Sequence, residues 1–120
     1  MHRNRDPVDV VVIIGQAGVG KTRACYNADE YLYQVTDFKW WDGYVSQETI
    51  LIDDFYGSRC SYSTLLRLLD RYQYSLPIKN SFTWKRWKTV LITSNVHPEQ
   101  WYTKGFTPAL QRRIDLILNV

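Results

Sequence analysis

Short apolar runs rich in β-branched residues alternate with amphipathic segments along this chain of 120 residues. Such runs are typical of strands buried on both faces of a sheet, and the amphipathic segments are typical of helices that cover one. The apolar runs predict strands at 8–14, 31–35, 49–53, 89–93 and 115–120. The other segments predict helices at 21–28, from Ser61 or Ser63 to about Tyr72, at 98–102 and at 108–113. The alternation predicts an α/β fold, with a central, mostly parallel five-stranded sheet flanked by helices.

The segment 76–87 has a different pattern, because apolar and polar residues alternate around Asn80-Ser81. This pattern predicts a β-hairpin just before the strand at 89–93. Cations and aromatic rings are interleaved here, and cations neutralise phosphates while rings stack on unpaired bases. Lys79, next to the expected tip, is the first candidate for contact with DNA, and the further candidates are Lys85, Arg86 and Lys88. The alternative is an amphipathic hairpin whose tryptophans lie in the core and whose cations are only solvated.

Composition and charge narrow the picture only a little. The length predicts a single domain over 1–120, with the polar residues 1–7 flexible. A net charge of +3 permits binding to nucleic acid without requiring it. No apolar stretch approaches the roughly 18 residues that span a bilayer, so no contact with a membrane is expected. The cysteines, Cys25 and Cys60, form no metal-binding or redox motif.

The turn between the first strand and the first helix has the sequence GQAGVGKT, which matches the P-loop pattern of nucleotide-binding proteins. Its glycines let backbone N–H groups approach phosphate oxygens, and the start of the next helix attracts anions. Lys21 is expected to reach the β- and γ-phosphates, and the Thr22 hydroxyl to ligate Mg²⁺. A glycine-rich turn without a ligand is the alternative. The residues expected to surround the phosphates are Gly15, Gln16, Ala17, Gly18, Val19, Gly20, Lys21 and Thr22.

Two further strands end in polar side chains that suit the same chemistry. Asp53 and Asp54 follow the run TILI, and Asn95 follows TVLITS. Asp53 is expected to hold Mg²⁺, and Asp54 to orient and deprotonate the attacking water. Asn95 is expected to contact both the γ-phosphate and that water. Ligands of open α/β sheets lie beyond the carboxyl ends of the strands, where all three side chains fall. The alternatives are acids that cap a loop and an asparagine in a turn.

Six motifs occur in a fixed order from about residue 10 to the end of the chain: GQAGVGKT, KWWDGY, TILIDDFYG, LLRLLDRY, VLITSN with PEQWY, and ALQRRI. In this set the chain resembles the superfamily 3 helicase domain of replication-initiator (Rep) proteins from circular single-stranded DNA viruses, most closely the circovirus type. The resemblance implies an AAA+-like ATPase that uses ATP and Mg²⁺ and forms a homo-oligomeric ring, a hexamer in the full-length protein. It implies movement 3′ to 5′ along single-stranded DNA in rolling-circle replication, in the host nucleus.

The resemblance also assigns roles to residues that the pattern alone does not. Arg112 or Arg113 matches the arginine finger that completes the ATP site of a neighbouring subunit, and two solvated arginines at a helix end are the alternative. The hairpin of this family points into the ring channel. The nickase domain of such Rep proteins needs a pair of histidines, but His2 and His97 are far apart, so we expect that this domain is absent. The motif KWWDGY predicts an aromatic-packed turn.

Two other functions stay open at this point. A small-molecule kinase would also use a P-loop, but it would need an acceptor pocket and an arginine-rich lid, and neither is evident in the sequence. A nucleotide-binding switch module would need a partner for hydrolysis. ATPase activity with and without single-stranded DNA distinguishes the three functions.

Overall fold

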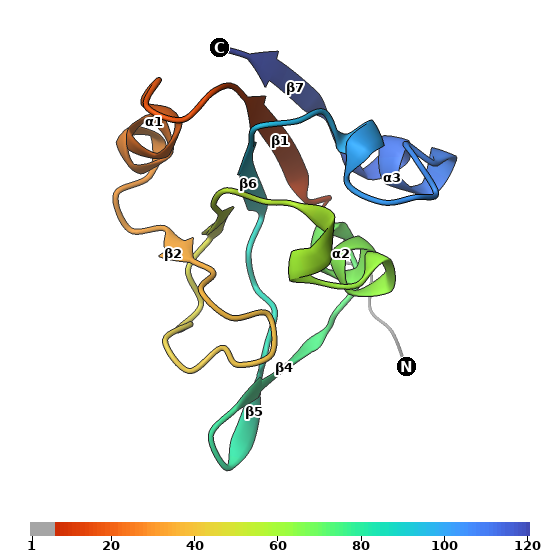
Figure 1. Ribbon diagram of the computed structural model, residues 1–120. Helices are drawn as coiled ribbons and strands as arrows, with labels where there is room; N and C mark the ends of the chain where they lie inside the picture. Colours follow the sequence, from red (N-terminus) through yellow and green to blue (C-terminus); the bar gives the residue numbers. More distant parts are fainter. Residues whose placement is uncertain (1–6) are drawn as a thin grey trace.

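The computed structural model describes residues 7–120, so the prediction of a flexible segment at 1–7 falls almost wholly outside the described residues. A five-stranded sheet in the order β2-β3-β6-β1-β7 forms the centre, and every pairing in it is parallel (Figure 1). Its strands are β1 (Asp9–Ile14), β2 (Tyr33–Gln34), β3 (Thr49–Ile52), β6 (Thr89–Ser94) and β7 (Leu116–Asn119). The prediction of a five-stranded α/β fold is confirmed.

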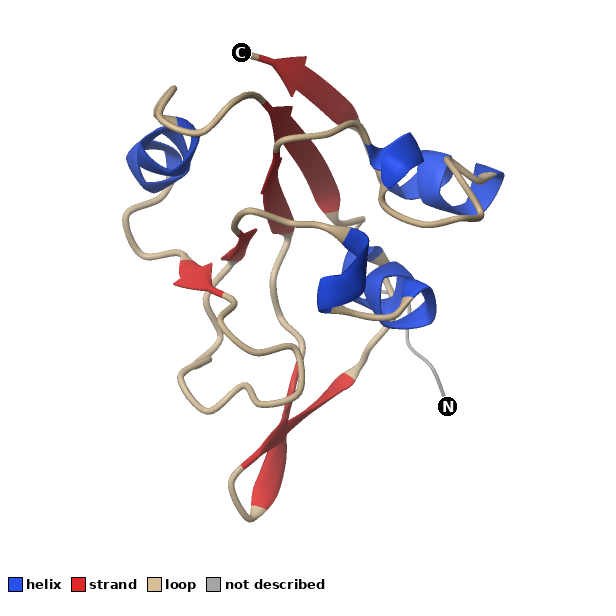
Figure 2. Cartoon of the chain, viewed as in Figure 1, coloured by secondary structure: helices blue, strands red, loops and turns tan. Residues whose placement is uncertain are grey.

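Three α-helices lie on the two faces of the sheet, α1 on one face and α2 and α3 on the other (Figure 2). They are α1 (Lys21–Ala28), α2 (Tyr62–Leu69) and α3 (Pro108–Arg113). Two short 3-10 turns, η1 (Gly57–Arg59) and η2 (Pro98–Gln100), precede α2 and α3 respectively. Ser61 is the N-cap of α2, since its hydroxyl accepts from the Thr64 N–H at 3.2 Å. The helix ends at Leu69 rather than near Tyr72, because Asp70 has an extended backbone. None of the helices within 7–120 is long and apolar enough to cross a membrane.

The buried side chains form two clusters, one on each face of the sheet. The larger cluster joins β1, β3 and β6 to α2 and α3, with Leu65, Leu68 and Leu110 fully buried. The smaller cluster lies under α1 and contains Ile13, Cys25, Leu32, Leu51 and Leu91. Burial on both faces explains why the central strands are continuous apolar runs rather than alternating ones.

The predicted hairpin is present as β4 (Ser75–Ile78) and β5 (Ser81–Trp84), which pair antiparallel and project away from the sheet (Figure 1). Asn80 at the tip has a φ of +63°, a conformation that asparagine tolerates better than most residues. In Figure 1 the tip points away from the end of the sheet where α1 begins. A DNA contact at the tip is therefore separate from the P-loop.

The motif KWWDGY forms the expected aromatic-packed turn and supports the hairpin. Trp41 stacks on Trp87 at 5.3 Å between ring centroids, and Tyr44 meets both rings edge-on. The backbone N–H of Trp41 donates to Pro77 O at 2.9 Å, and the Asp42 carboxylate accepts from the backbone N–H of Lys79 at 2.7 Å. Trp87 is thus a core residue that fixes the base of the hairpin, as the alternative interpretation of this segment expected.

Candidate functional site

The parallel register places the predicted site residues at one edge of the sheet. Ile14 pairs with Ser94, and Ile52 pairs with Ile92, so the P-loop, the two aspartates and Asn95 all follow neighbouring strand ends. A cavity of about 420 Å³ opens at this edge. Its lining contains Ala17, Gly18, Gly20, Lys21, Thr22, Arg23, Asp53, Asp54, Thr93 and Asn95. Its volume lies in the usual range for small-molecule sites.

The P-loop has the backbone geometry that its glycines allow. Gly18 and Gly20 both have a φ of +88°, and Gly20 is the N-cap of α1 without any side-chain cap bond. The first N–H groups of α1 therefore face the cavity edge without a side-chain acceptor, which favours an anion there. The Lys21 ammonium donates to Gly15 O and, at 2.9 Å, to Gln16 O, and it lies 3.3 Å from Asn95 Oδ1.

Oxygen ligands suited to Mg²⁺ meet beside the P-loop. The hydroxyls of Thr22 and Thr93 both donate to Asp53 Oδ1, at 2.8 and 2.7 Å. Mg²⁺ prefers hard oxygen ligands and, in nucleotide sites, uses one or two protein groups together with phosphates and waters. The pair of Thr22 and Asp53 fits this requirement, because both oxygens lie at the cavity that Lys21 borders.

Sequence analysis missed two residues of the cavity, Arg23 and Thr93. Each lies within two residues of a predicted site residue, and this closeness in the sequence is the signal that could have identified them. Arg23 lies on the first turn of α1, one residue after Thr22, and its side chain is exposed. Thr93 is a buried residue near the end of β6, two residues before Asn95.

The thiol nearest to the cavity is unsuited to nucleophilic chemistry. Cys25 lies on the buried side of α1. Burial and, secondarily, the negative charge of Asp53 raise the pKa of Cys25 to about 11. Its thiol is therefore neutral at physiological pH, and only thiolates are reactive nucleophiles.

Comparison with known proteins identifies the family. The sequence model of the RNA helicase family matches residues 11–96, which include the P-loop, both aspartates and Asn95. The chain belongs to the RNA helicase family. Its curated relatives include the replication-associated proteins of Canary circovirus and Goose circovirus, each 42% identical over 109 and 113 residues, or 89% and 92% of this chain. That of Porcine circovirus 1 is 38% identical over 106 residues, or 85% of this chain.

The relationship confirms the predicted resemblance to the helicase domain of circovirus Rep proteins. This helicase-family chain spans 37%, 38% and 33% of the lengths of those three relatives, respectively. The matched residues 11–96 include every residue that lines the P-loop cavity, so the family assignment and the cavity geometry concern the same residues.

The candidate finger arginines of the helicase domain lie outside this cavity. They end α3, and the Asp115 N–H that follows them donates to Val10 O at 2.9 Å, near the start of β1. The P-loop follows the other end of β1, about 13 Å farther along the strand. Arg113 donates to Asp70 Oδ2 at 3.0 Å and to Ala109 O at 2.9 Å, whereas the Arg112 side chain is exposed and makes no hydrogen bond or ion pair within residues 7–120.

Most of the predicted DNA-binding cations of the helicase domain are exposed on or near the hairpin. Lys79 lies next to the tip, and Arg86 and Lys88 lie where β5 leads into β6. Lys88 is 3.5 Å from Glu48, a surface ion pair of little energetic weight. Two exposed rings, Phe82 and Trp84, lie edge to face at 5.2 Å on the same strand.

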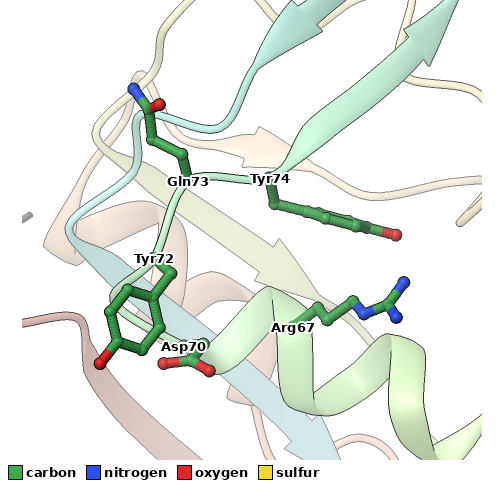
Figure 3. A pocket seen from close by; sticks show the side chains of 5 residues that line it. All are labelled: Arg67, Asp70, Tyr72, Gln73 and Tyr74. Carbon is green, nitrogen blue, oxygen red and sulfur yellow. The ribbon is translucent and has the colours of Figure 1, made fainter. Parts of the chain in front are cut away.

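The prediction that Lys85 contacts DNA is wrong, because its side chain is only 1% exposed. Its ammonium donates to Arg67 O at 2.9 Å and to Asp70 O, so it caps the C-terminus of α2. A cation at this end of a helix satisfies carbonyls that have no partner in the helix. Beside this cap, Asp70 and Arg67 border a surface pocket of about 510 Å³ (Figure 3). This pocket shares no lining residue with the P-loop cavity.

We expect Lys85→Met to lower the free energy of unfolding by about 1–3 kcal/mol, because two helix-end carbonyls lose their donor. Chemical denaturation measures this loss. Lys88→Met is the matched control and should change stability by less than about 0.5 kcal/mol, since Lys88 is exposed. Full stability of Lys85→Met together with weaker DNA binding would return Lys85 to the DNA-binding surface.

Proposed function

We propose that this helicase-family domain hydrolyses ATP with Mg²⁺ and uses the energy to move along single-stranded DNA as part of a viral Rep protein. One observation carries the proposal: P-loop, aspartate and asparagine side chains from three strand ends converge on a single cavity. The relationship to circovirus replication-associated proteins supports the role in rolling-circle replication. Action in the host nucleus and movement 3′ to 5′ belong to the same proposal.

Each residue at the cavity has a distinct proposed role. The N–H groups of the P-loop, with its residues 15–20, and the Lys21 ammonium bind the β- and γ-phosphates. Thr22 and Asp53 hold Mg²⁺, which neutralises charge on the phosphates when it is bound. Asp54 accepts the proton of the attacking water. The amide of Asn95 contacts the γ-phosphate and that water, and the 3.3 Å distance between its Oδ1 and the Lys21 ammonium supports this role.

The position of the arginines supports catalysis between subunits. Because Arg112 and Arg113 lie at the far end of β1 from the P-loop, neither serves the cavity of its own chain in this structure. An arginine supplied by a neighbour stabilises the charge of the transition state. We place Arg112 first as the finger, because Arg113 is held by Asp70. This requires a homo-oligomer, and a hexameric ring is the form that we propose for the full-length protein.

The direct test is the ATPase rate of the chain with and without single-stranded DNA. Stimulation by DNA supports the helicase function. Transfer of phosphate to a small metabolite would support a kinase instead, and tight nucleotide binding without turnover would support a switch module. Neither alternative has a specific structural observation in its favour.

We expect Lys79→Ala to weaken binding to all single-stranded DNA sequences about equally, because a lysine at the tip contacts phosphates rather than bases. The slope of log affinity against log salt concentration should fall by roughly one unit in fluorescence anisotropy titrations. Basal ATPase should be unchanged, since the tip lies away from the P-loop, while stimulation by DNA should fall. Unchanged DNA binding, or loss of basal ATPase, would contradict the assignment of the hairpin.

A further inference from the structure

The peptide bond between Asp53 and Asp54 is held by side chains at both of its ends. Its carbonyl, that of Asp53, accepts from the Arg59 guanidinium. Its N–H, that of Asp54, donates to Thr93 Oγ1 at 2.8 Å. The same Thr93 hydroxyl donates its proton to Asp53 Oδ1 at 2.7 Å, so this hydroxyl acts as acceptor toward one aspartate and as donor toward the other.

This peptide needs such support because of the backbone conformation of Asp54. Asp54 has a φ of +53°, in the left-handed region that side chains make unfavourable. Aspartate tolerates this region better than most residues, but the conformation still costs free energy that surrounding contacts offset, and such residues are frequent at functional sites. Rotation of this peptide toward an ordinary conformation would break both hydrogen bonds and move the Asp54 carboxylate.

Arg59 reaches the peptide from a turn that is itself fixed. It ends η1, and its guanidinium lies 5.3 Å from the centre of the Phe38 ring. Gly57, at the start of the same turn, packs directly on the backbone of Trp101, since a Cβ on Gly57 would lie 1.6 Å from Trp101 O. The turn therefore has little freedom to shift, and the Arg59 guanidinium is presented to the Asp53 carbonyl.

We propose that Arg59 and Thr93 are positioning residues. They hold the peptide between Asp53 and Asp54 so that Asp54 keeps its left-handed backbone conformation and its carboxylate stays in the nucleotide cavity. The inference rests on the proposed function, because it assumes that Asp54 acts on the attacking water. Arg59 does not line the cavity, so its effect on hydrolysis is indirect. Thr93 lines the cavity, but its hydroxyl is committed to the two aspartates.

The test separates turnover from nucleotide binding in two independent pairs of variants. Arg59→Met removes the donor but keeps an unbranched side chain, and Thr93→Val removes the hydroxyl at about the same volume. We expect kcat for ATP to fall at least about 10-fold in each, with KM changed by less than about twofold. Arg59→Lys keeps a cationic donor and Thr93→Ser keeps the hydroxyl, so each of these variants should retain most of the parent kcat.

Arg67→Met is the matched control. Arg67 also places its guanidinium against an aromatic ring, 6.0 Å from the centre of Tyr74, but it lies on α2 beside a different pocket (Figure 3). The kcat of Arg67→Met should equal that of the parent. Crystal structures of Arg59→Met and Thr93→Val should show Asp54 with a negative φ.

Three results would overturn the proposal. They are an unchanged kcat in both disruptive variants, a rise in KM at constant kcat, and a crystallographic φ of Asp54 that stays near +53° in both variants. A parent chain that does not hydrolyse ATP would refute the proposed function instead. The conformation of Asp54 in the variants still tests the holding role of Arg59 and Thr93 in that case.

Discussion

Lys21→Ala should reduce the rate of ATP hydrolysis by at least about 10²-fold, while the melting temperature stays within a few degrees of the parent. Within residues 7–120, the Lys21 ammonium donates only to Gly15 O, Gln16 O and Asn95 Oδ1, and none of these three residues is buried. Because no core packing depends on its ammonium, the fold should persist. The loss should appear in turnover, since we propose that this ammonium binds the β- and γ-phosphates.

Lys104→Ala provides the control for loss of a lysine charge. Lys104 is exposed and lies over the Tyr62 ring at 5.1 Å, away from every cavity residue, so its variant should hydrolyse ATP at the parent rate. A coupled-enzyme assay measures both rates, and thermal unfolding checks the fold. An Lys21→Ala variant that keeps most of the parent rate would refute the P-loop assignment.

The grouping of the site residues at the carboxyl ends of the parallel strands was predictable, because it follows from local sequence patterns. Continuous β-branched runs predict parallel strands, and parallel strands carry their polar ends to one edge of the sheet. Thus Lys21, Asp53 and Asn95, which are distant along the chain, were expected together and lie around one cavity. Their proposed roles in hydrolysis remain to be tested by the variants above.

The side chains that sequence analysis misplaced or missed depend on distant contacts. Lys85 follows an exposed strand, and only the packing of α2 against the hairpin turns it inward to Arg67 O and Asp70 O. Arg112 and Arg113 are neighbours in a helix of six residues. Such a helix is too short for its hydrophobic periodicity to show which of the two arginines contacts Asp70. Arg59 reaches Asp53 only because its turn packs on a distant part of the chain.

If an arginine of one subunit completes the ATP site of its neighbour, two inactive variants should restore activity when they are mixed. We expect Lys21→Ala and Arg112→Ala each to be inactive alone, because one lacks the P-loop ammonium and the other lacks the finger. In a mixed oligomer, an Arg112→Ala subunit offers an intact cavity and a neighbouring Lys21→Ala subunit offers an intact arginine. Random assembly at equal concentrations gives about a quarter of interfaces with both parts intact. Partial recovery of ATPase should follow, and specific activity of the parent should rise with protein concentration.

The control mixture combines Lys21→Ala with Asp54→Asn, whose defects lie in the same cavity. No interface of that mixture is complete, so no recovery is expected at any ratio. Arg113→Ala distinguishes the two arginines: it should lower stability, since it removes the contact with Asp70, and retain more ATPase per folded molecule than Arg112→Ala. If Arg113→Ala is inactive and complements Lys21→Ala while Arg112→Ala is active, then Arg113 is the finger. A rate independent of concentration, with no recovery in any mixture, would show that neither arginine acts between subunits.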